Sequence, residues 1–173
     1  MADGTEFEDL VAAFYRPLYQ FAFSLTRDEP KSCDLVQETF CIWANKGHQL
    51  RDKTKVKTWL FTTLHREFLG ERRKETRFPH LDLDGAEAEL PALPSATISH
   101  LDTEQMLAAL SQLDKIYQAP VTLFYLQDCS YNEIAEILGV PIGTVKSRLA
   151  RGLGRLHQSL IGEKMEPPKP TNS

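Results

Sequence analysis

Apolar side chains recur every three or four positions along both halves of the chain, which is the spacing of an α-helix. In the first half this repeat covers residues 7–25 and 31–46, and it resumes at 56 before a basic tract that ends at 77. In the second half it covers 102–113, 114–128 and 130–138, followed by a terminal helix that ends near 160. Alternating strand patterns are weak throughout. The pattern therefore predicts an all-α protein.

Several residues mark where these helices begin, bend and end. The tetrapeptides TEFE (5–8) and SYNE (130–133) have the Ser/Thr-x-x-Glu pattern of an N-terminal capping box. Gly47 is placed to end the second helix, because the residue that follows a helix often takes a conformation that glycine tolerates best. Proline lacks the backbone N–H of a helix. We therefore expect Pro17 to kink the first helix, and Pro120 to delay or bend the helix around it.

A change in composition divides the chain in two. Residues 78–100 contain three prolines, one glycine and four acidic side chains, without any Lys or Arg. Such a stretch is typical of a linker. We predict two small helical domains, at 5–78 and 99–161, joined by an acidic flexible linker at 79–98. A tail at 162–173 is expected to be disordered.

The net charge of −4 conceals an uneven distribution of charge along the chain. Residues 66–77 carry five basic side chains against three Glu, and residues 141–161 carry four basic side chains and no acidic one. Residues 79–104, between them, carry six acidic side chains and no basic one. Each basic block can attract phosphate locally although the whole chain is acidic.

Composition also excludes several classes of protein. No apolar run approaches the roughly 20 residues that span a bilayer, and the acidic N-terminus lacks the layout of a signal peptide. We therefore expect a cytoplasmic protein. The three cysteines form no CxxC pair, and no His/Cys cluster has the spacing of a zinc site. We expect reduced, structural thiols, no metal site and no cofactor.

The segment SYNEIAEILGVPIGTVKSRLARG (130–152) has the pattern of a helix-turn-helix. Ala135 is small where two helices must cross closely, Gly139 allows a sharp turn, and Val145 is placed to pack on the first helix. At about 100° per residue, the second helix has a core side and an outward side. The core side contains Val145, Leu149, Gly152 and Leu156. The outward side contains Ser147, Arg151 and Gly154, flanked by Lys146 and Ala150.

This outward side suits close approach to a DNA major groove, because it combines small residues with long cations. Arginine can form two hydrogen bonds with one guanine, and neighbouring cations can hold phosphates. The candidate DNA-binding residues are Thr144, Lys146, Ser147, Arg148, Arg151 and Arg155. The alternative is a solvated basic face on a structural pair of helices.

A second informative segment is DLVQETFCIW (34–43). One amphipathic helix accounts for its apolar residues. It does not explain why Asp34, Gln37 and Glu38 gather on the polar side. These three residues form either a contact surface for a partner or an ordinary solvated face.

Taken together, DLVQETF (34–40), WLFTTLHREFLGERRKE (59–75), the acidic linker and LDKIYQAPVTLFYLQDCSYNEIAEILGVPIGTVKSRL (113–149) resemble a bacterial RNA polymerase sigma factor of the extracytoplasmic-function (ECF) class. The likeness covers about residues 7–160. It implies that the two halves are sigma regions 2 and 4. A departure is Arg66, where the commoner pattern of this class has an Asn.

The resemblance implies a role for each block. Asp34, Gln37 and Glu38 would bind the clamp helices of the largest subunit of core RNA polymerase. The loop at 48–55 and the following helix would engage the −10 promoter element. The basic residues expected to bind the DNA backbone there are Arg66, Arg72, Arg73, Lys74 and Arg77. Trp59 is either a core residue or a wedge against a base pair.

The same resemblance implies that the helix around Lys146, Ser147 and Arg151 recognises the −35 element. The acidic linker would follow the RNA path of the polymerase, unless it is only a solubilising spacer. The resemblance also implies a separate anti-sigma factor as inhibitor. The protein itself would be a monomer when free, would not be an enzyme and would bind no small-molecule substrate.

Two other functions compete with this one. A conventional dimeric helix-turn-helix regulator would bind a palindromic operator without polymerase. An enzyme built from a helical bundle would need a positioned acid or base in a pocket. The chain has no Glu-x-x-His pair, no phosphate loop and no nucleophile motif.

Overall fold

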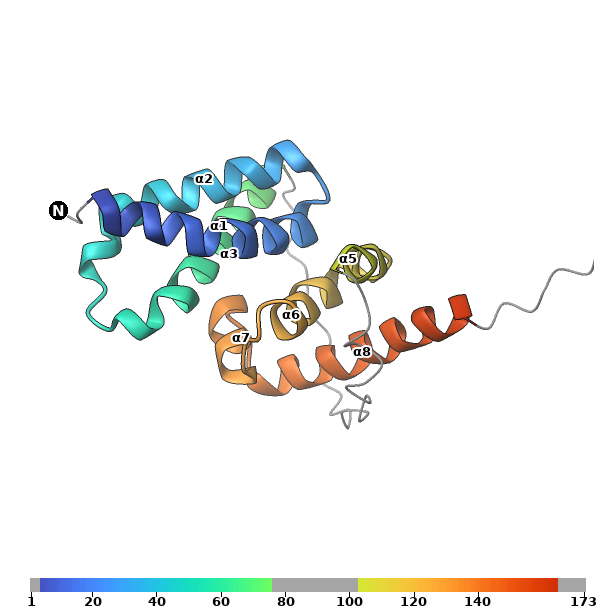
Figure 1. The fold of residues 1–173 in the computed structure, drawn as a ribbon. Helices are drawn as coiled ribbons and strands as arrows, with labels where there is room; N and C mark the ends of the chain where they lie inside the picture. Colours follow the sequence, from blue (N-terminus) through green and yellow to red (C-terminus); the bar gives the residue numbers. More distant parts are fainter. Residues whose placement is uncertain (1–3, 76–102, 165–173) are drawn as a thin grey trace, which may run out of the picture.

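The computed structural model describes residues 4–75 and 103–164. Within these ranges the chain forms seven α-helices and two short 3-10 turns and contains no strand, which confirms the all-α prediction (Figure 1). The elements of the first half are α1 (Gly4–Thr26), α2 (Glu29–Lys46), η1 (Gly47–Gln49), η2 (Lys53–Lys55) and α3 (Val56–Glu75). Those of the second half are α5 (Thr103–Ser111), α6 (Lys115–Tyr125), α7 (Tyr131–Leu138) and α8 (Ile142–Lys164).

Helices α1, α2 and α3 form a three-helix bundle around one apolar core. Its fully buried side chains come from all three helices, and they are Leu18, Phe21, Ala22, Leu35, Val36, Leu60, Phe61 and Leu64. The rings of Phe21 and Phe61 lie 5.4 Å apart and join α1 to α3. Full burial of a large apolar side chain contributes about 1.5–3 kcal/mol. These positions follow the helical repeat of the sequence, so the pattern predicts the inner face of each helix.

The start of α2 is fixed by a side-chain cap. Asp28 Oδ1 accepts a hydrogen bond from Lys31 N at 3.0 Å, and Ser32 Oγ donates to the carbonyl of Asp28 at 2.7 Å. Pro30 lies in the first turn, where its missing N–H costs nothing. The helix therefore begins two residues before the predicted position 31.

Gly47 follows α2 for a different reason from the predicted one. Its φ of −59° is right-handed, so the expected left-handed helix end is wrong. A Cβ atom added at this position would lie 2.5 Å from the ring of Trp43. Glycine is thus required by the packing of the indole ring against the backbone.

The prolines also leave their helices largely intact. Pro17 lies inside α1, which continues to Thr26. Helix α6 begins at Lys115, five residues before Pro120, so this proline does not delay its start.

Helix α8 extends to Lys164, beyond its predicted end near Leu160. The predicted linker at 79–98 and the tail beyond 164 lie outside the described residues.

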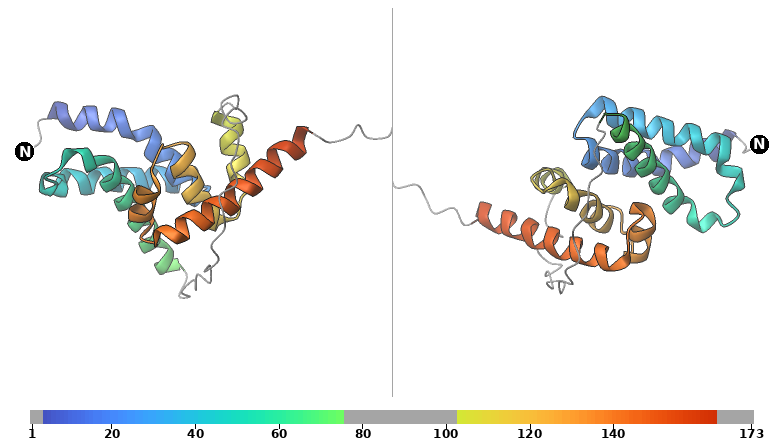
Figure 2. Two further views of the ribbon diagram at one scale, coloured as in Figure 1. Left: turned by 90° about the horizontal axis from the view of Figure 1, so that it is seen from below. Right: turned by 180° about the vertical axis from the view of Figure 1, so that it is seen from behind.

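The two halves pack against each other rather than standing apart (Figure 2). Helix α1 contacts α5 and α6, and helix α3 contacts α7. Helix α8 is the long helix on the far side of the second half from α1 and α2 (Figure 1). None of the helices within 4–75 and 103–164 combines the length and apolar content needed to cross a membrane.

Candidate nucleic-acid interface

Helices α7 and α8 form the predicted helix-turn-helix. Ser130 Oγ accepts a hydrogen bond from Glu133 N at 3.2 Å, and Glu133 Oε2 accepts one from Ser130 N at 2.8 Å, which confirms the second capping box. Gly139 has a φ of +65°, a conformation that L side chains rarely adopt, and it turns the chain between the helices. Val145 is fully buried against this turn.

The core side of α8 also agrees with prediction. Leu149 and Leu156 are buried, and Gly152 approaches α6 closely. A Cβ atom at 152 would lie 2.7 Å from Val121 Cγ2 and 3.0 Å from Tyr117 Cβ. Glycine therefore permits α8 to cross α6 at short range.

The outward side of α8 differs from the prediction. Lys146 is exposed, and Thr144 and Arg151 are half-buried. Ser147 and Ala150, expected on the outward side, are only 2% and 5% exposed, and this expectation is wrong for the closed arrangement seen here. Arg148 is also buried, at 7% exposure. The helical repeat predicts that α8 is buried on one side only, where it packs on α7. The middle of α8 is in fact buried on other sides as well.

The charge of Arg148 also acts on a residue of the first half. Burial lowers the pKa of His65, in α3, to about 4, and the positive charge of Arg148 lowers it further. Helix α8 itself packs on α5, α6 and α7.

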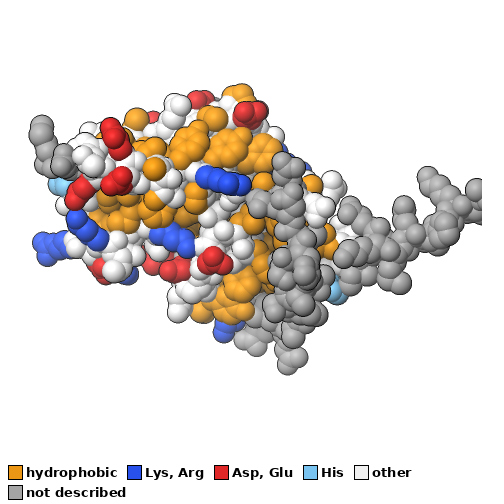
Figure 3. Space-filling model, viewed as in Figure 1, with side chains coloured by type: hydrophobic (Ala, Val, Ile, Leu, Met, Phe, Trp, Pro, Cys, Tyr) orange, Lys and Arg blue, Asp and Glu red, His pale blue; other side chains and the backbone are white. Residues whose placement is uncertain are grey.

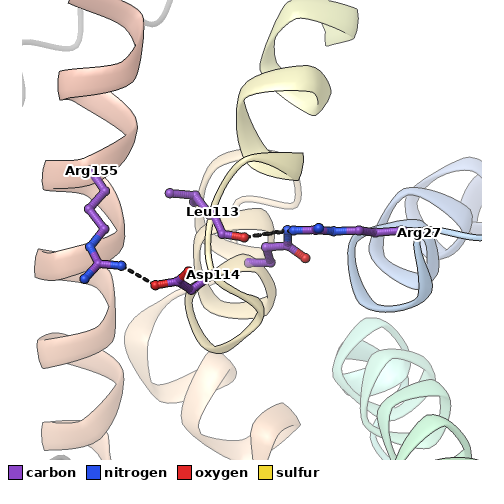
Figure 4. A network of polar contacts seen from close by, with 5 residues as sticks. Arg27, Leu113, Asp114 and Arg155 are labelled. Atoms are coloured by element: carbon purple, nitrogen blue, oxygen red, sulfur yellow. Dashed lines mark hydrogen bonds and ion pairs between the residues drawn. The ribbon is translucent and has the colours of Figure 1, made fainter.

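Arg155 lies at another contact inside the second half. Its guanidinium forms an ion pair with Asp114 (Figure 4). It also lies over the ring of Tyr117, 5.0 Å from the ring centre. Asp114 belongs to the turn between α5 and α6. The side chain of Arg155 is still 54% exposed, so the ion pair is solvated and contributes little to stability.

A hollow of about 440 Å³ lies between α2, the following loop and α3. It is lined by Ile42, Lys46, Gln49, Leu50, Trp59, Thr63, Arg66 and Glu67. Trp59 is half-buried, and its ring meets that of Trp43 edge-on at 5.1 Å. Trp59 thus packs against the bundle and also forms part of the wall of the hollow. A position in the core and a contact with a DNA base, the two roles considered for Trp59, are therefore compatible.

Basic side chains lie in the wall of this hollow, at Lys46 and Arg66, and elsewhere on α3 and the loop before it. Arg66, Arg73 and Lys74 of α3 are exposed, and Arg72 lies over the ring of Phe68 at 5.8 Å. Lys53 and Lys55 are exposed on the loop between α2 and α3, which Asp52 shapes by accepting a hydrogen bond from Thr54 N at 3.0 Å. Arg77 lies outside the described residues. Figure 3 shows Lys and Arg side chains, with Asp and Glu among them, at the end of the first bundle where α1 begins.

The acidic and polar side chains of α2 form a separate surface. Asp34, Gln37 and Glu38 are all exposed and lie on one side of the helix, opposite the buried Leu35 and Val36. None of the three is needed for the core. The structure therefore brings them together on a surface that is available to a partner.

The sequence does not predict the contacts between the two halves of the protein. They involve Arg27, Lys57 and Gln127, which the sequence presents as ordinary polar residues of a turn, a helix start and a loop. The chain carries no signal for them, since each contact joins residues at least 70 positions apart.

Both halves of the chain match known protein families. Residues 10–78 match the family model of sigma-70 region 2, and residues 103–156 match that of sigma-70 region 4. The chain is 33% identical over 150 residues to the ECF RNA polymerase sigma factor EcfG of Rhodopseudomonas palustris, covering 86% of this chain and 81% of that protein. It is 26% identical over 163 residues to the RNA polymerase sigma factor YlaC of Bacillus subtilis, covering 92% of this chain and 94% of that one.

Solved structures agree with this assignment. The sigma factor RpoE of Bartonella quintana, crystallised in complex with the anti-sigma factor NepR, superposes with a TM-score of 0.66 at 32% identity, covering 94% of this chain and 99% of that one. CnrH, solved with the cytosolic domain of CnrY, shares the fold with a TM-score of 0.62 at 22% identity, covering 94% of this chain and 92% of that one. Together with the helix-turn-helix and the basic helix α3, these similarities show that the chain belongs to the ECF family of RNA polymerase sigma factors.

Proposed function

We propose that this sigma factor binds core RNA polymerase through α2 and directs it to promoters that it reads with α3 and α8. The observation that supports this most directly is that one chain combines three separate surfaces. These are the exposed polar side of α2, the hollow beside the basic helix α3, and the helix-turn-helix of α7 and α8. A conventional dimeric regulator would need only the last of them.

At the −35 element, α8 enters the major groove with its N-terminal half. Lys146 is exposed and Thr144 and Arg151 are partly exposed, so they make the first contacts with phosphates and base edges. Ser147 and Arg148 join them once the middle of the helix is uncovered. Arg155 reaches a phosphate after it leaves Asp114.

At the −10 element, the hollow beside α3 receives an unstacked base of the non-template strand. Trp59 offers a ring edge and face for stacking, and Gln49 and Arg66 offer hydrogen bonds to the edge of the base. The adjacent phosphates are held by Arg66, Arg72, Arg73 and Lys74 of α3, together with Arg77, which lies outside the described residues. Arg66 thus stands where an Asn is commoner in this class.

The partners follow from the same surfaces. Asp34, Gln37 and Glu38 contact the clamp helices of the largest polymerase subunit, and polymerase carries out the chemistry, so the sigma factor itself is not an enzyme. The protein is cytoplasmic, and it is a monomer when it is not bound to polymerase. RpoE and CnrH were each solved with an inhibitor, and we propose an anti-sigma factor for this chain as well.

The test is reconstitution with core RNA polymerase, followed by run-off transcription on promoter fragments from the source organism. The wild-type protein should co-elute with core and give discrete transcripts. Glu38→Lys should weaken binding to core, whereas Glu8→Lys, a matched reversal on the exposed side of α1, should not. A dimer that binds an operator tightly and ignores core polymerase would overturn the proposal.

A further inference from the structure

The first turn of α8 carries an exposed isoleucine. Within the described residues, only Tyr15 and Ile142 are large apolar side chains that remain exposed, at 41% and 40%. A single exposed apolar residue is ordinary on a protein surface. The position of Ile142 sets it apart, because it is the first residue of α8. In a helix-turn-helix, the N-terminal residues of the second helix are the ones that contact base edges.

The helical repeat alone would bury Ile142. At about 100° per residue, it lies about 20° around the helix from Leu149 and about 60° from Val145, and both of these residues are fully buried. The neighbours of Ile142 explain the difference. Pro141 and Gly143 are exposed as well, and a Cβ atom at Gly143 would have no atom within 4 Å. The first turn of α8 therefore projects beyond the core of the helix-turn-helix.

The projecting turn is held in place by hydrogen bonds on both sides of it. Val140 N donates to the carbonyl of Ala135 at 3.2 Å at the end of α7, and Val145 N donates to the carbonyl of Pro141 at 3.2 Å in α8. Branching at Cβ restricts the side chain of Ile142 to few rotamers. The isoleucine is thus presented at a defined position, as contact with a single small group on the DNA requires.

The polar side chains around Ile142 suit other tasks. Ser147 is 2% exposed, and its Oγ donates a hydrogen bond to the carbonyl of Thr144 at 3.1 Å. Lys146 is exposed and lies one turn after Ile142 on the same side of the helix. Its flexible ammonium group is suited to a phosphate. The exposed end of α8 therefore combines a cation for the DNA backbone with an apolar surface for a base edge.

An apolar side chain recognises one feature of the major groove. Thymine presents its 5-methyl group there, whereas cytosine presents an amino group, and apolar side chains make contact with the methyl group. We propose that Ile142 contacts the 5-methyl group of a thymine in the −35 element and is a specificity-determining residue of α8. This inference rests on the proposed function, and it adds a base preference to a surface assigned from its polar residues.

The test is a double-mutant cycle with one change in the protein and the other in the DNA. The full-length protein is reconstituted with core RNA polymerase, and a −35 element is mapped by run-off transcription on promoter fragments. Each thymine on either strand of that element is then replaced singly by deoxyuridine, which forms the same base pair but lacks the methyl group. Competition binding to the holoenzyme measures the relative affinity of each fragment.

Two variants change the contacting side chain. Ile142→Ala removes most of it, and Ile142→Val shortens it by one methylene group. Tyr15→Ala is the matched control, because it removes an apolar side chain of similar exposure from α1. At one thymine, deoxyuridine should lower the affinity of the wild type about fourfold, the value for burial of one methyl-sized group. The loss should be smaller for Ile142→Val and absent for Ile142→Ala, and Tyr15→Ala should keep the wild-type response.

A second arm separates the methyl group from the base that carries it. Exchange of the same thymine for cytosine, paired with guanine, should weaken binding of the wild type. Exchange for 5-methylcytosine should restore about fourfold over cytosine, because the methyl group returns to the same carbon of the ring. Ile142→Ala should bind the two cytosine fragments equally well.

A wild type that binds every deoxyuridine fragment as well as its parent would overturn the assignment of Ile142. So would a mapped −35 element without an A·T pair. A loss of equal size in the wild type and in Ile142→Ala would also overturn it, because the methyl group would then act through the shape of the DNA. Should Ile142→Ala fail to fold by circular dichroism, Ile142→Val takes its place, with a reduced response expected.

Run-off transcription separates these outcomes from failure of the proposed function. A wild type that initiates with core polymerase but does not respond to the methyl groups loses only the contact of Ile142. A wild type that never initiates loses the proposed function, and the contact with it.

Discussion

The crossing of α8 over α6 gives a sharp prediction, because two glycines two residues apart have opposite surroundings. A Cβ atom at Gly152 would lie 2.7 Å from Val121 Cγ2, whereas one at Gly154 would have no atom within 4 Å. Replacing a glycine inside a helix by alanine stabilises the helix by about 1 kcal/mol where nothing obstructs the methyl group. Gly154→Ala should therefore raise the free energy of unfolding by up to about 1 kcal/mol.

Gly152→Ala gains the same helix preference but forces the side chains of α6 to move. Inserting an extra methyl group into a packed core costs about 1–3 kcal/mol. The net effect is a loss of about 0–2 kcal/mol, and the two variants should differ by about 1–3 kcal/mol. For a chain of this size, 1 kcal/mol shifts the melting temperature by about 2–4 °C. The two melting temperatures should thus lie roughly 2–12 °C apart.

The assay is thermal unfolding of both variants, followed by circular dichroism at 222 nm. Gly143→Ala is a second control, because the first turn of α8 also leaves open space for a methyl group. It should behave like Gly154→Ala. Equal melting temperatures for Gly152→Ala and Gly154→Ala would refute the close approach of α8 to α6.

Four further predictions follow from particular contacts. Burial, helped by the nearby Arg148, lowers the pKa of His65 to about 4, so its unfolded form takes up a proton first as the pH falls. The stabilisation from neutral His65 is complete above about pH 6.5 and is lost between pH 6.5 and 4, by no more than about 3 kcal/mol. Urea unfolding across this pH range should show a decrease in the free energy of unfolding. His65→Gln should remove this part of the pH dependence. Gly47→Ala should displace the ring of Trp43, destabilise the protein by about 1–3 kcal/mol and change the emission of its two tryptophans. Ser130→Ala removes the cap of α7 and should lower the free energy of unfolding by about 1 kcal/mol in urea titrations. Arg151→Ala should reduce run-off transcription from −35-dependent promoters without changing co-elution with core polymerase, and equal loss of both would contradict its assignment to DNA.

Local features of the fold are predictable because their causes lie within a few residues. The cap of α7 depends on Ser130 and Glu133, and the turn after it depends on Gly139, all inside ten positions of the sequence. The core of the first bundle likewise follows from the spacing of residues such as Phe21 and Leu35. Periodicity and caps are local signals, so one sequence is enough to read them.

The failures have two different origins. Gly47 is required by the ring of Trp43, four residues earlier, and a single sequence does not distinguish this local contact from a left-handed helix end. Ser147 is buried although it lies opposite the core side of α8, so this part of α8 is covered on a second side. Helical periodicity predicts one covered side of a helix and gives no signal for a second one.

The turn between α5 and α6 contacts both the first half of the protein and α8. Leu113 accepts the hydrogen bond from Arg27 of the first half, and the adjacent Asp114 holds Arg155 of α8 (Figure 4). The Arg155–Asp114 pair is exposed on both sides, so breaking it costs little. The contact from Arg27 instead ends on a backbone carbonyl that Gln118 also holds. The two contacts of this turn therefore differ in kind although they lie on adjacent residues, and neither follows from the periodicity of the helices that they join.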